Sequence, residues 1–260
     1  MRNVSLNYPV RRVQMKLHFS QNKPLKLLID LIYPPRCPVC GQPAAFGLKI
    51  CPECRRQLPL IESKRCRKCG KPVEDFEVLC PDCAKEDHFY DRGLGIYVYD
   101  ETMKRAISEL KYKGRREYGE VFGDLIYENA RSELMDWKPD CLIPIPLHRA
   151  RVRERGYNQA QIIAEALSEK CGIPTRADIL IRTMETGRMK ELSAKDRMNN
   201  MTSAFEAVGD RKGIRSVVLI DDIYTTGATI DAASVVLRRA GIDEIYFLAV
   251  CIGGGFMVSY

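Results

Sequence analysis

The residues with the clearest chemical capacity lie together between Val217 and Thr229. A run of apolar residues is followed by two carboxylates, Asp221 and Asp222, and then by a turn of hydroxyl residues around one glycine. If a helix begins after this turn, its first N–H groups and the positive end of its dipole suit a phosphate monoester. Carboxylates instead suit hydroxyl donors or positive charge. A ribose that carries a 5-phosphate needs both kinds of group at this spacing.

The same stretch predicts a division of roles. The turn from Thr225 to Thr229 is expected to hold the phosphate, while Asp221 and Asp222 accept hydrogen bonds from the 2- and 3-hydroxyls. If the bond at ribose C1 breaks, the two carboxylates stabilise the positive charge that develops on the ring. The simpler alternative is a strand that happens to end in two acids, with a threonine capping the next helix. A nucleotide-hydrolysing P-loop is disfavoured because the turn lacks the required lysine.

A strand and a helix must position this turn. The four apolar residues 217–220 are typical of a strand buried on both faces of a parallel sheet, which we expect to end at the two carboxylates. Residues 230–240 form a helical pattern that stops at Gly241. Further strands are expected at 94–99, 141–146, 179–181 and 244–251, and helices at 101–113, 117–134 and 162–170. Their alternation predicts an α/β domain with a mainly parallel sheet flanked by helices.

Cysteines supply a second kind of chemistry. Eight of the eleven form two copies of the pattern C-x2-C-G-x9-C-x2-C. This spacing is typical of zinc ribbons, and eight thiolates suffice for two tetrahedral structural Zn²⁺ sites. Sequential pairing closes the shorter loops, whereas an interleaved pairing of the first and third pairs stays open. The predicted metal ligands are Cys37, Cys40, Cys51, Cys54, Cys66, Cys69, Cys80 and Cys83.

Composition and length set the outer bounds. The 260 residues carry a net charge of +7, which permits a polyanionic partner. The sequence has no signal peptide and no apolar run near the roughly 18 residues of a membrane span, so a reducing cytoplasm is expected. We predict a disordered leader over 1–22, a short helix and double zinc ribbon over 23–88, and the α/β domain over 89–260.

Arginines gather after the strand expected at 141–146. Four of them alternate within the seven residues 149–155, where a parallel strand delivers its loop to the ligand edge of a sheet. Guanidinium groups suit pyrophosphate oxygens. The predicted contacts to pyrophosphate or another polyanion are Pro146, His148, Arg149, Arg151 and Arg155. One pyrophosphate does not need so many, so the surplus, together with the basic residues at 104–116, also fits a longer phosphate chain.

These segments resemble a known family. The stretch 217–229 is similar to the signature by which type I phosphoribosyltransferases bind phosphoribosyl pyrophosphate (PRPP). With the Pro-Pro-Arg-Cys-Pro-Val-Cys-Gly segment at 34–41, Leu-Lys-Tyr-Lys-Gly at 110–114, Pro-Ile-Pro-Leu-His at 144–148 and Arg-Gly-Tyr-Asn-Gln at 155–159, it resembles the ComF family, cytoplasmic proteins of bacterial competence for DNA uptake.

The resemblance implies a zinc-bearing module joined to a type I phosphoribosyltransferase domain. It implies PRPP with Mg²⁺ as ligand, single-stranded DNA and a competence helicase-like ATPase as partners, and a hood over the sugar at 182–200. The PRPP contacts that it implies are Asp221, Asp222, Tyr224, Thr225, Thr226, Gly227, Ala228 and Thr229, with the two acids as catalytic residues.

Whether the chain is an enzyme stays open at this point. One reading is a transferase in which a nitrogen nucleophile displaces pyrophosphate. A second is a non-catalytic factor that binds single-stranded nucleic acid with the same pocket. A third is an assembly factor that acts through the zinc module.

Overall fold

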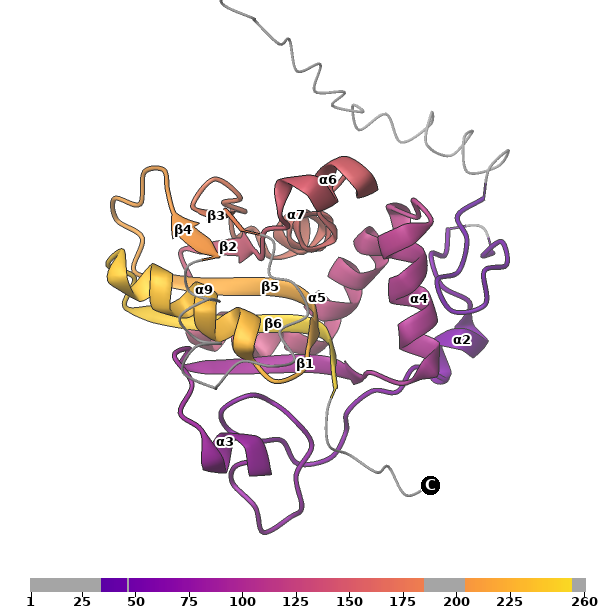
Figure 1. The fold of residues 1–260 in the computed structure, drawn as a ribbon. Coiled ribbons are helices and arrows are strands. Elements are labelled where there is room, and N and C mark those ends of the chain that lie inside the picture. The colour runs from indigo at the N-terminus through magenta and orange to yellow at the C-terminus, as the bar shows by residue number, and fades with distance from the viewer. Residues whose placement is uncertain (1–33, 46, 185–203, 254–260) are drawn as a thin grey trace, which may run out of the picture. The chain divides into compact units, whose positions relative to one another are not determined.

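Four parallel strands form the sheet that carries the predicted site, in the order β1-β6-β5-β2 (Figure 1). The computed structural model describes residues 34–45, 47–184 and 204–253. The strands are β1 (Arg92–Val98), β2 (Cys141–Pro144), β5 (Ser216–Tyr224) and β6 (Glu244–Ile252). The interiors of β2, β5 and β6 are buried on both faces, as in other parallel sheets covered by helices. The predicted α/β class is confirmed.

Strand β5 is longer than the sequence predicted. We expected it to end at Ile220, but it continues through both carboxylates to Tyr224. The reason is its register with β6, which supplies backbone partners as far as Tyr224 opposite Ile252. Because side chains alternate along a strand, Asp221 and Asp222 leave β5 toward opposite faces of the sheet.

Helices α4 (Glu101–Tyr112), α5 (Glu117–Trp137) and α7 (Gln159–Cys171) cover one face of the sheet. Their apolar side chains share a buried cluster with Val218 and Ile220 of β5. Each helix lies near its predicted range, because an apolar stripe at helical spacing marks it in the sequence.

Helix α9 (Ala228–Arg239) covers the other face, with Val217 and Leu219 of β5 beneath it. A separate antiparallel pair, β3 (Leu180–Arg182) and β4 (Phe205–Ala207), lies outside the main sheet. We predicted a strand near β3 but not β4, because three residues are too few to show a period.

The arginine run after β2 is a helix and not the loop that we expected. Helix α6 (Arg149–Arg155) begins at His148, whose Nδ1 accepts a hydrogen bond from the N–H of Ala150 at 3.3 Å. It ends at Gly156, whose φ of 82° gives the left-handed conformation common after helices. A cap and a terminating glycine therefore define this short helix.

The two cysteine repeats have the same local structure. Each contains a short helix that begins with proline, α2 (Pro52–Arg56) and α3 (Pro81–Lys85). In each, a glycine with positive φ, Gly41 or Gly70, donates its N–H to the carbonyl of the first cysteine. The sequence repeat is thus a structural repeat.

The repeats pack on opposite faces of the sheet. The first shares the buried cluster of α4 and α5, and Lys49 pairs with Asp124 of α5 at 3.0 Å. The second shares the cluster of α9, and the N–H of Gly93 in β1 donates to the carbonyl of Lys68 at 2.9 Å. A continuous core therefore crosses the domain boundary predicted between residues 88 and 89.

Several predictions concern residues that the structure does not describe. The leader over 1–22, the helix over 24–33 and the hood from 185 onward lie outside the described ranges.

The contact of α5 with α7 yields a stability prediction. A Cβ on Gly123 would lie 2.6 Å from Cβ of Ala166 and 2.8 Å from the carbonyl oxygen of Ile163, and the latter is backbone. Gly123→Ala should therefore lower the free energy of unfolding by about 1–3 kcal/mol, although alanine favours a helix by about 1 kcal/mol over glycine.

Urea unfolding measures this change, with exposed Ser132→Ala on the same helix as the control. A midpoint for Gly123→Ala at or above that of the wild type would contradict the close packing of these helices.

Candidate functional site

The predicted phosphate turn lies at the carboxyl end of β5. Thr225 and Thr226 are exposed, and α9 begins after Gly227, which has φ 87°. Among the described residues, no side chain caps α9. The alternative in which Thr225 or Thr226 caps this helix is therefore wrong. The N–H groups of the first turn of α9 remain available to an anion.

Gly227 cannot be replaced without moving its neighbours. A Cβ would lie 2.6 Å from Oη of Tyr224 and 3.1 Å from Cε1 of His88. The positive φ adds strain for any other residue. Both the conformation and the packing of the turn thus depend on glycine here.

The two predicted carboxylates have different surroundings. Asp222 is buried and forms an ion pair with Nζ of Lys111 on α4. Burial alone would lower the pKa of Lys111, but the charge of Asp222, its hydrogen bond to Lys111 and the charge of Asp221 together raise that pKa. Lys111 therefore stays charged and holds Asp222 on the side of α4.

Asp221 is half-buried, and its Oδ1 accepts a hydrogen bond from the N–H of Asp222 at 2.8 Å. Burial, followed by the negative charge of Asp222, raises the pKa of Asp221 well above its usual value. A cationic group placed beside Asp221 would reverse this shift, because it favours the ionised form.

The predicted pyrophosphate residues do not all come together. Pro146, His148 and Arg149 line a cavity of about 650 Å³ with Arg116 and Arg182. Neither Arg151, nor Arg155, nor any residue from 221 to 229 lines this cavity.

Arg155 has other partners. Its guanidinium lies 5.1 Å from the ring centre of Tyr112, and Nη1 donates to Oε1 of Gln159 at 2.5 Å. His148 caps α6, which explains its presence without a catalytic role. The cavity lined by Arg116, Arg149 and Arg182 and the turn after β5 are thus two separate features.

Sequence reasoning missed four residues around the turn. Lys111 pairs with Asp222, and Asp231 in the first turn of α9 binds His88 at 2.8 Å. The hydroxyl groups of Tyr90 and Tyr224 form a hydrogen bond of 2.7 Å, and Tyr224 is itself a predicted site residue. Lys111 lies in the segment 110–114 that carries part of the family resemblance, and this was the signal that could have identified Lys111 as a site residue.

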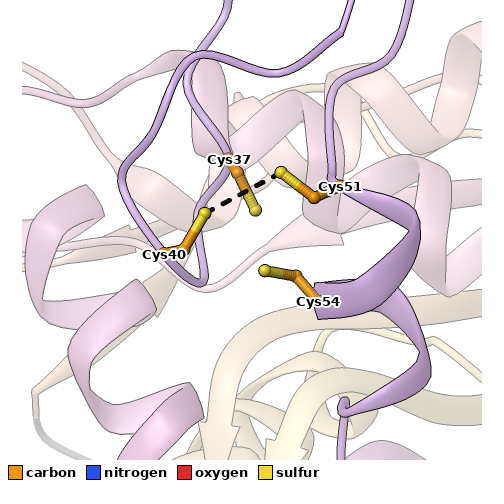
Figure 2. A group of neighbouring side chains, drawn as sticks. All are labelled: Cys37, Cys40, Cys51 and Cys54. Atoms are coloured by element: carbon orange, nitrogen blue, oxygen red, sulfur yellow. Dashed lines mark hydrogen bonds between the residues drawn. The ribbon is translucent and has the colours of Figure 1, made fainter.

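The eight cysteines form two clusters with the predicted sequential pairing. Within each cluster the sulfur atoms lie within 4.8 Å of one another, and all eight are free cysteines. Figure 2 shows the four sulfurs of the first cluster directed toward one centre. The Sγ atoms of Cys40 and Cys51 are 3.8 Å apart, and those of Cys69 and Cys80 are 3.6 Å apart.

These distances fit zinc. A tetrahedral Zn²⁺ at about 2.3 Å from each thiolate separates its sulfurs by about 3.8 Å. Burial would raise the pKa of the Cys37 thiol, but the N–H groups of Cys40, Cys51 and Val39 outweigh it and lower that pKa to about 7. Cys37 is therefore ready to bind a metal as thiolate.

Within the described residues, no helix is both long and apolar enough to cross a membrane.

Comparisons with known proteins agree with the cysteine pattern. A family described as a double zinc ribbon domain matches residues 28–84. Among solved structures, the chain is similar to a purine phosphoribosyltransferase from Pyrococcus horikoshii, with 21% identity over 52% of this chain and 81% of the other, at a TM-score of 0.33. A TM-score of this size does not establish a shared fold.

Relatives in sequence carry names from DNA uptake and use. Competence protein F of Haemophilus influenzae is 32% identical over 62% of this chain and 72% of its own length. Competence protein ComFC of Bacillus subtilis is 31% identical over 56% of this chain and 58% of its own length. DNA utilization protein YhgH of Escherichia coli K12 is 27% identical over 83% of both chains.

The similarity to the Haemophilus protein extends over more than two thirds of that protein at over 30% identity. This chain also has the two cysteine clusters and the turn after β5 that are described above. The chain therefore belongs to the ComF family of competence proteins.

Proposed function

We propose that the chain binds PRPP with Mg²⁺ at the carboxyl end of β5 and transfers its phosphoribosyl group. One observation carries the proposal: helix α9 starts without a side-chain cap at Gly227, a few residues after two adjacent carboxylates. An anion site and hydroxyl acceptors then lie at one end of one strand. A ribose with a 5-phosphate matches that pair of sites.

The turn binds the 5-phosphate in this account. The N–H groups at the start of α9 donate to phosphate oxygens, and the exposed Thr225 and Thr226 add hydroxyl donors. Because Gly227 has no side chain, the phosphate can approach the backbone closely.

The carboxylates bind the ribose. Asp221 accepts hydrogen bonds from ring hydroxyls in its ionised form, which the positive charge that Mg²⁺ would bring with PRPP favours. Asp222 pairs with Lys111, and because a carboxylate accepts several hydrogen bonds, this pair leaves acceptor capacity for the ligand. Both charges stabilise an oxocarbenium-like transition state.

The proposed reaction forms one bond and breaks another at C1. A nitrogen nucleophile attacks C1 with inversion, and the electron pair of the C1–O bond leaves with pyrophosphate. Mg²⁺ that arrives with PRPP neutralises oxygens of the leaving group. Arg149, Arg151 and Arg155, with Pro146 and His148, are the proposed contacts on the side of the pyrophosphate.

The names of the relatives support a role in DNA handling. Proteins named for competence and for DNA utilization are similar to this chain over 58–83% of their own lengths. We therefore propose a role in the cytoplasm with incoming single-stranded DNA, beside a helicase-like ATPase. The two cysteine clusters are proposed to hold structural zinc.

Substitution of Asp221 tests the ribose contact. Asp221→Asn should weaken binding of Mg-PRPP about 10–100-fold, because it removes a hydrogen bond to a charged acceptor worth about 1.5–3 kcal/mol. Isothermal titration calorimetry of the full chain measures the affinity.

Asp136→Asn, an exposed carboxylate on α5, is the control and should leave the affinity unchanged. Equal affinities for wild type and Asp221→Asn would remove Asp221 from the site.

Release of pyrophosphate tests catalysis. With PRPP and a panel of nitrogen nucleophiles, Asp222→Asn should slow release by about 100-fold, because a preorganised charge is lost at the developing cation. The thermal midpoint of the variant shows whether Lys111, left without its partner, disturbs the fold. If the wild type releases no pyrophosphate above background with any nucleophile, the transferase proposal fails.

A second candidate function rests on α6. Arg149, Arg151 and Arg153 are exposed on one short helix, and Tyr112, 67% exposed, lies beside Arg155. Arginines near an exposed aromatic ring suit the backbone and stacked bases of single-stranded nucleic acid. In this reading the chain binds the strand without catalysis.

Salt dependence distinguishes this candidate. Affinity for an oligothymidylate should fall steeply with salt, and replacing both Arg151 and Arg153 with Gln should reduce the log–log slope by about 1.4, or about 0.7 per lost phosphate contact. Fluorescence anisotropy at several salt concentrations gives the slope. Arg92→Gln with Arg239→Gln, two exposed arginines elsewhere, is the matched control. A slope unchanged by the α6 pair would exclude this surface.

A further inference from the structure

The segment between the second cysteine cluster and β1 lies under the candidate phosphate turn. Nδ1 of His88 and Oδ2 of Asp231 are 2.8 Å apart, and the N–H of Phe89 donates to Oδ1 of Asp231 at 2.8 Å. The side chains of His88 and Asp231 are 3% and 5% exposed. Both carboxylate oxygens of a first-turn residue of α9 are thus bound by residues 88 and 89.

The same segment touches the turn itself. The ring of His88 and the hydroxyl of Tyr224 lie against Gly227, where a Cβ would clash with both. Tyr90 stacks on His88 with ring centres 5.0 Å apart and hydrogen-bonds to Tyr224. The conformation of Gly227 is therefore set from below by His88 and Tyr224.

His88 is not placed there for stability alone. Its Nε2 is buried and has no hydrogen-bond partner among the described residues. An unpaired buried polar atom costs about 1–3 kcal/mol. A buried polar pair can fix one geometry without adding to stability. The His88–Asp231 pair thus serves to hold α9 and its turn in one position.

The second cysteine cluster holds this segment in turn. Lys71, 2% exposed, pairs with Asp82 at 2.6 Å and lies 5.8 Å from the ring centre of Tyr224. A Cβ on Gly70 would lie 2.8 Å from the carbonyl oxygen of Gly93, so the turn that carries Cys66 and Cys69 packs directly against β1. The cluster and the turn share one buried layer that includes Tyr90 and Tyr224.

The described contacts of the first cluster lie elsewhere. It packs in the cluster of α4 and α5 on the other face of the sheet, and Lys49 joins it to Asp124 and Glu120. This difference between two repeats of the same spacing supplies an internal control.

We propose that His88 and Asp231 are positioning residues that link the second cysteine cluster, in its metal-bound form, to the phosphate turn. The link rests on the proposed function in so far as the turn binds the phosphate of PRPP. Metal bound at the second cluster then favours the binding conformation of the turn, and by reciprocity an anion in the turn favours metal retention at that cluster. The first cluster takes no part.

Hydrogen exchange of the full-length, zinc-loaded chain tests the link without any ligand. Amides of residues 228–235 should exchange about tenfold faster in His88→Ala and in Cys80→Ser. They should be unchanged in Cys51→Ser and Lys49→Met. His88→Asn, whose side-chain N–H can replace that of Nδ1, should restore most of the protection.

Global unfolding is checked by the urea midpoint and by amides of β6. If Cys80→Ser unfolds the chain, the comparison of His88→Ala with His88→Asn decides the matter. Unchanged exchange at 228–235 in His88→Ala would overturn the proposal, as would equal effects of Cys80→Ser and Cys51→Ser.

Metal release supplies the reciprocal measurement. Transfer of zinc to a colorimetric chelator should show two phases, one absent in Cys51→Ser and one absent in Cys80→Ser. Saturating Mg-PRPP should slow only the phase absent in Cys80→Ser, and equal slowing of both phases would overturn the link. If the wild type binds no PRPP by calorimetry, the proposed function fails, while the exchange data still judge the link.

Discussion

The candidate site depends on the constraint at Gly227. Its φ of 87° turns the chain from β5 into α9, and its neighbours leave no room for a side chain. Because the turn is tight, the N–H groups of α9 lie a few residues from Asp221 and Asp222. Another residue here would move Tyr224 or His88 and with them the start of the helix. The chemistry proposed for the chain follows from this one backbone position.

The sheet separates the parts of the site. Alternation along β5 sends Asp222 toward Lys111 on one face, while α9 and its turn belong to the other. The two cysteine repeats divide in the same way, one with α5 and one beneath the turn. The repeats are equal in sequence spacing, yet within the described ranges it is the second that packs with Tyr90 and Tyr224 beside the phosphate turn. The two repeats offer the same four cysteine ligands and differ in the face of the sheet against which they pack.

Much of this arrangement could be predicted from local patterns. The apolar run before Asp221, the helical stripes of α4, α5 and α7, and the cysteine spacing each depend on neighbours in sequence, as does the sequential pairing of cysteines. The end of β5 could not be predicted, because β6 extends it through long-range backbone pairing. The pairs His88–Asp231 and Lys111–Asp222 join residues more than 100 positions apart, and no period or spacing marks them. Helix α6 was missed because its arginines recur at every second position and it has no buried apolar stripe at helical spacing.

The position of the 5-phosphate in a crystal grown with Mg-PRPP tests the central claim most directly. The account predicts phosphate oxygens within hydrogen-bond distance of the N–H groups at the start of α9, with the ribose hydroxyls at Asp221. A phosphate found instead in the cavity lined by Arg116 and Arg149, with the turn after β5 empty, would contradict it.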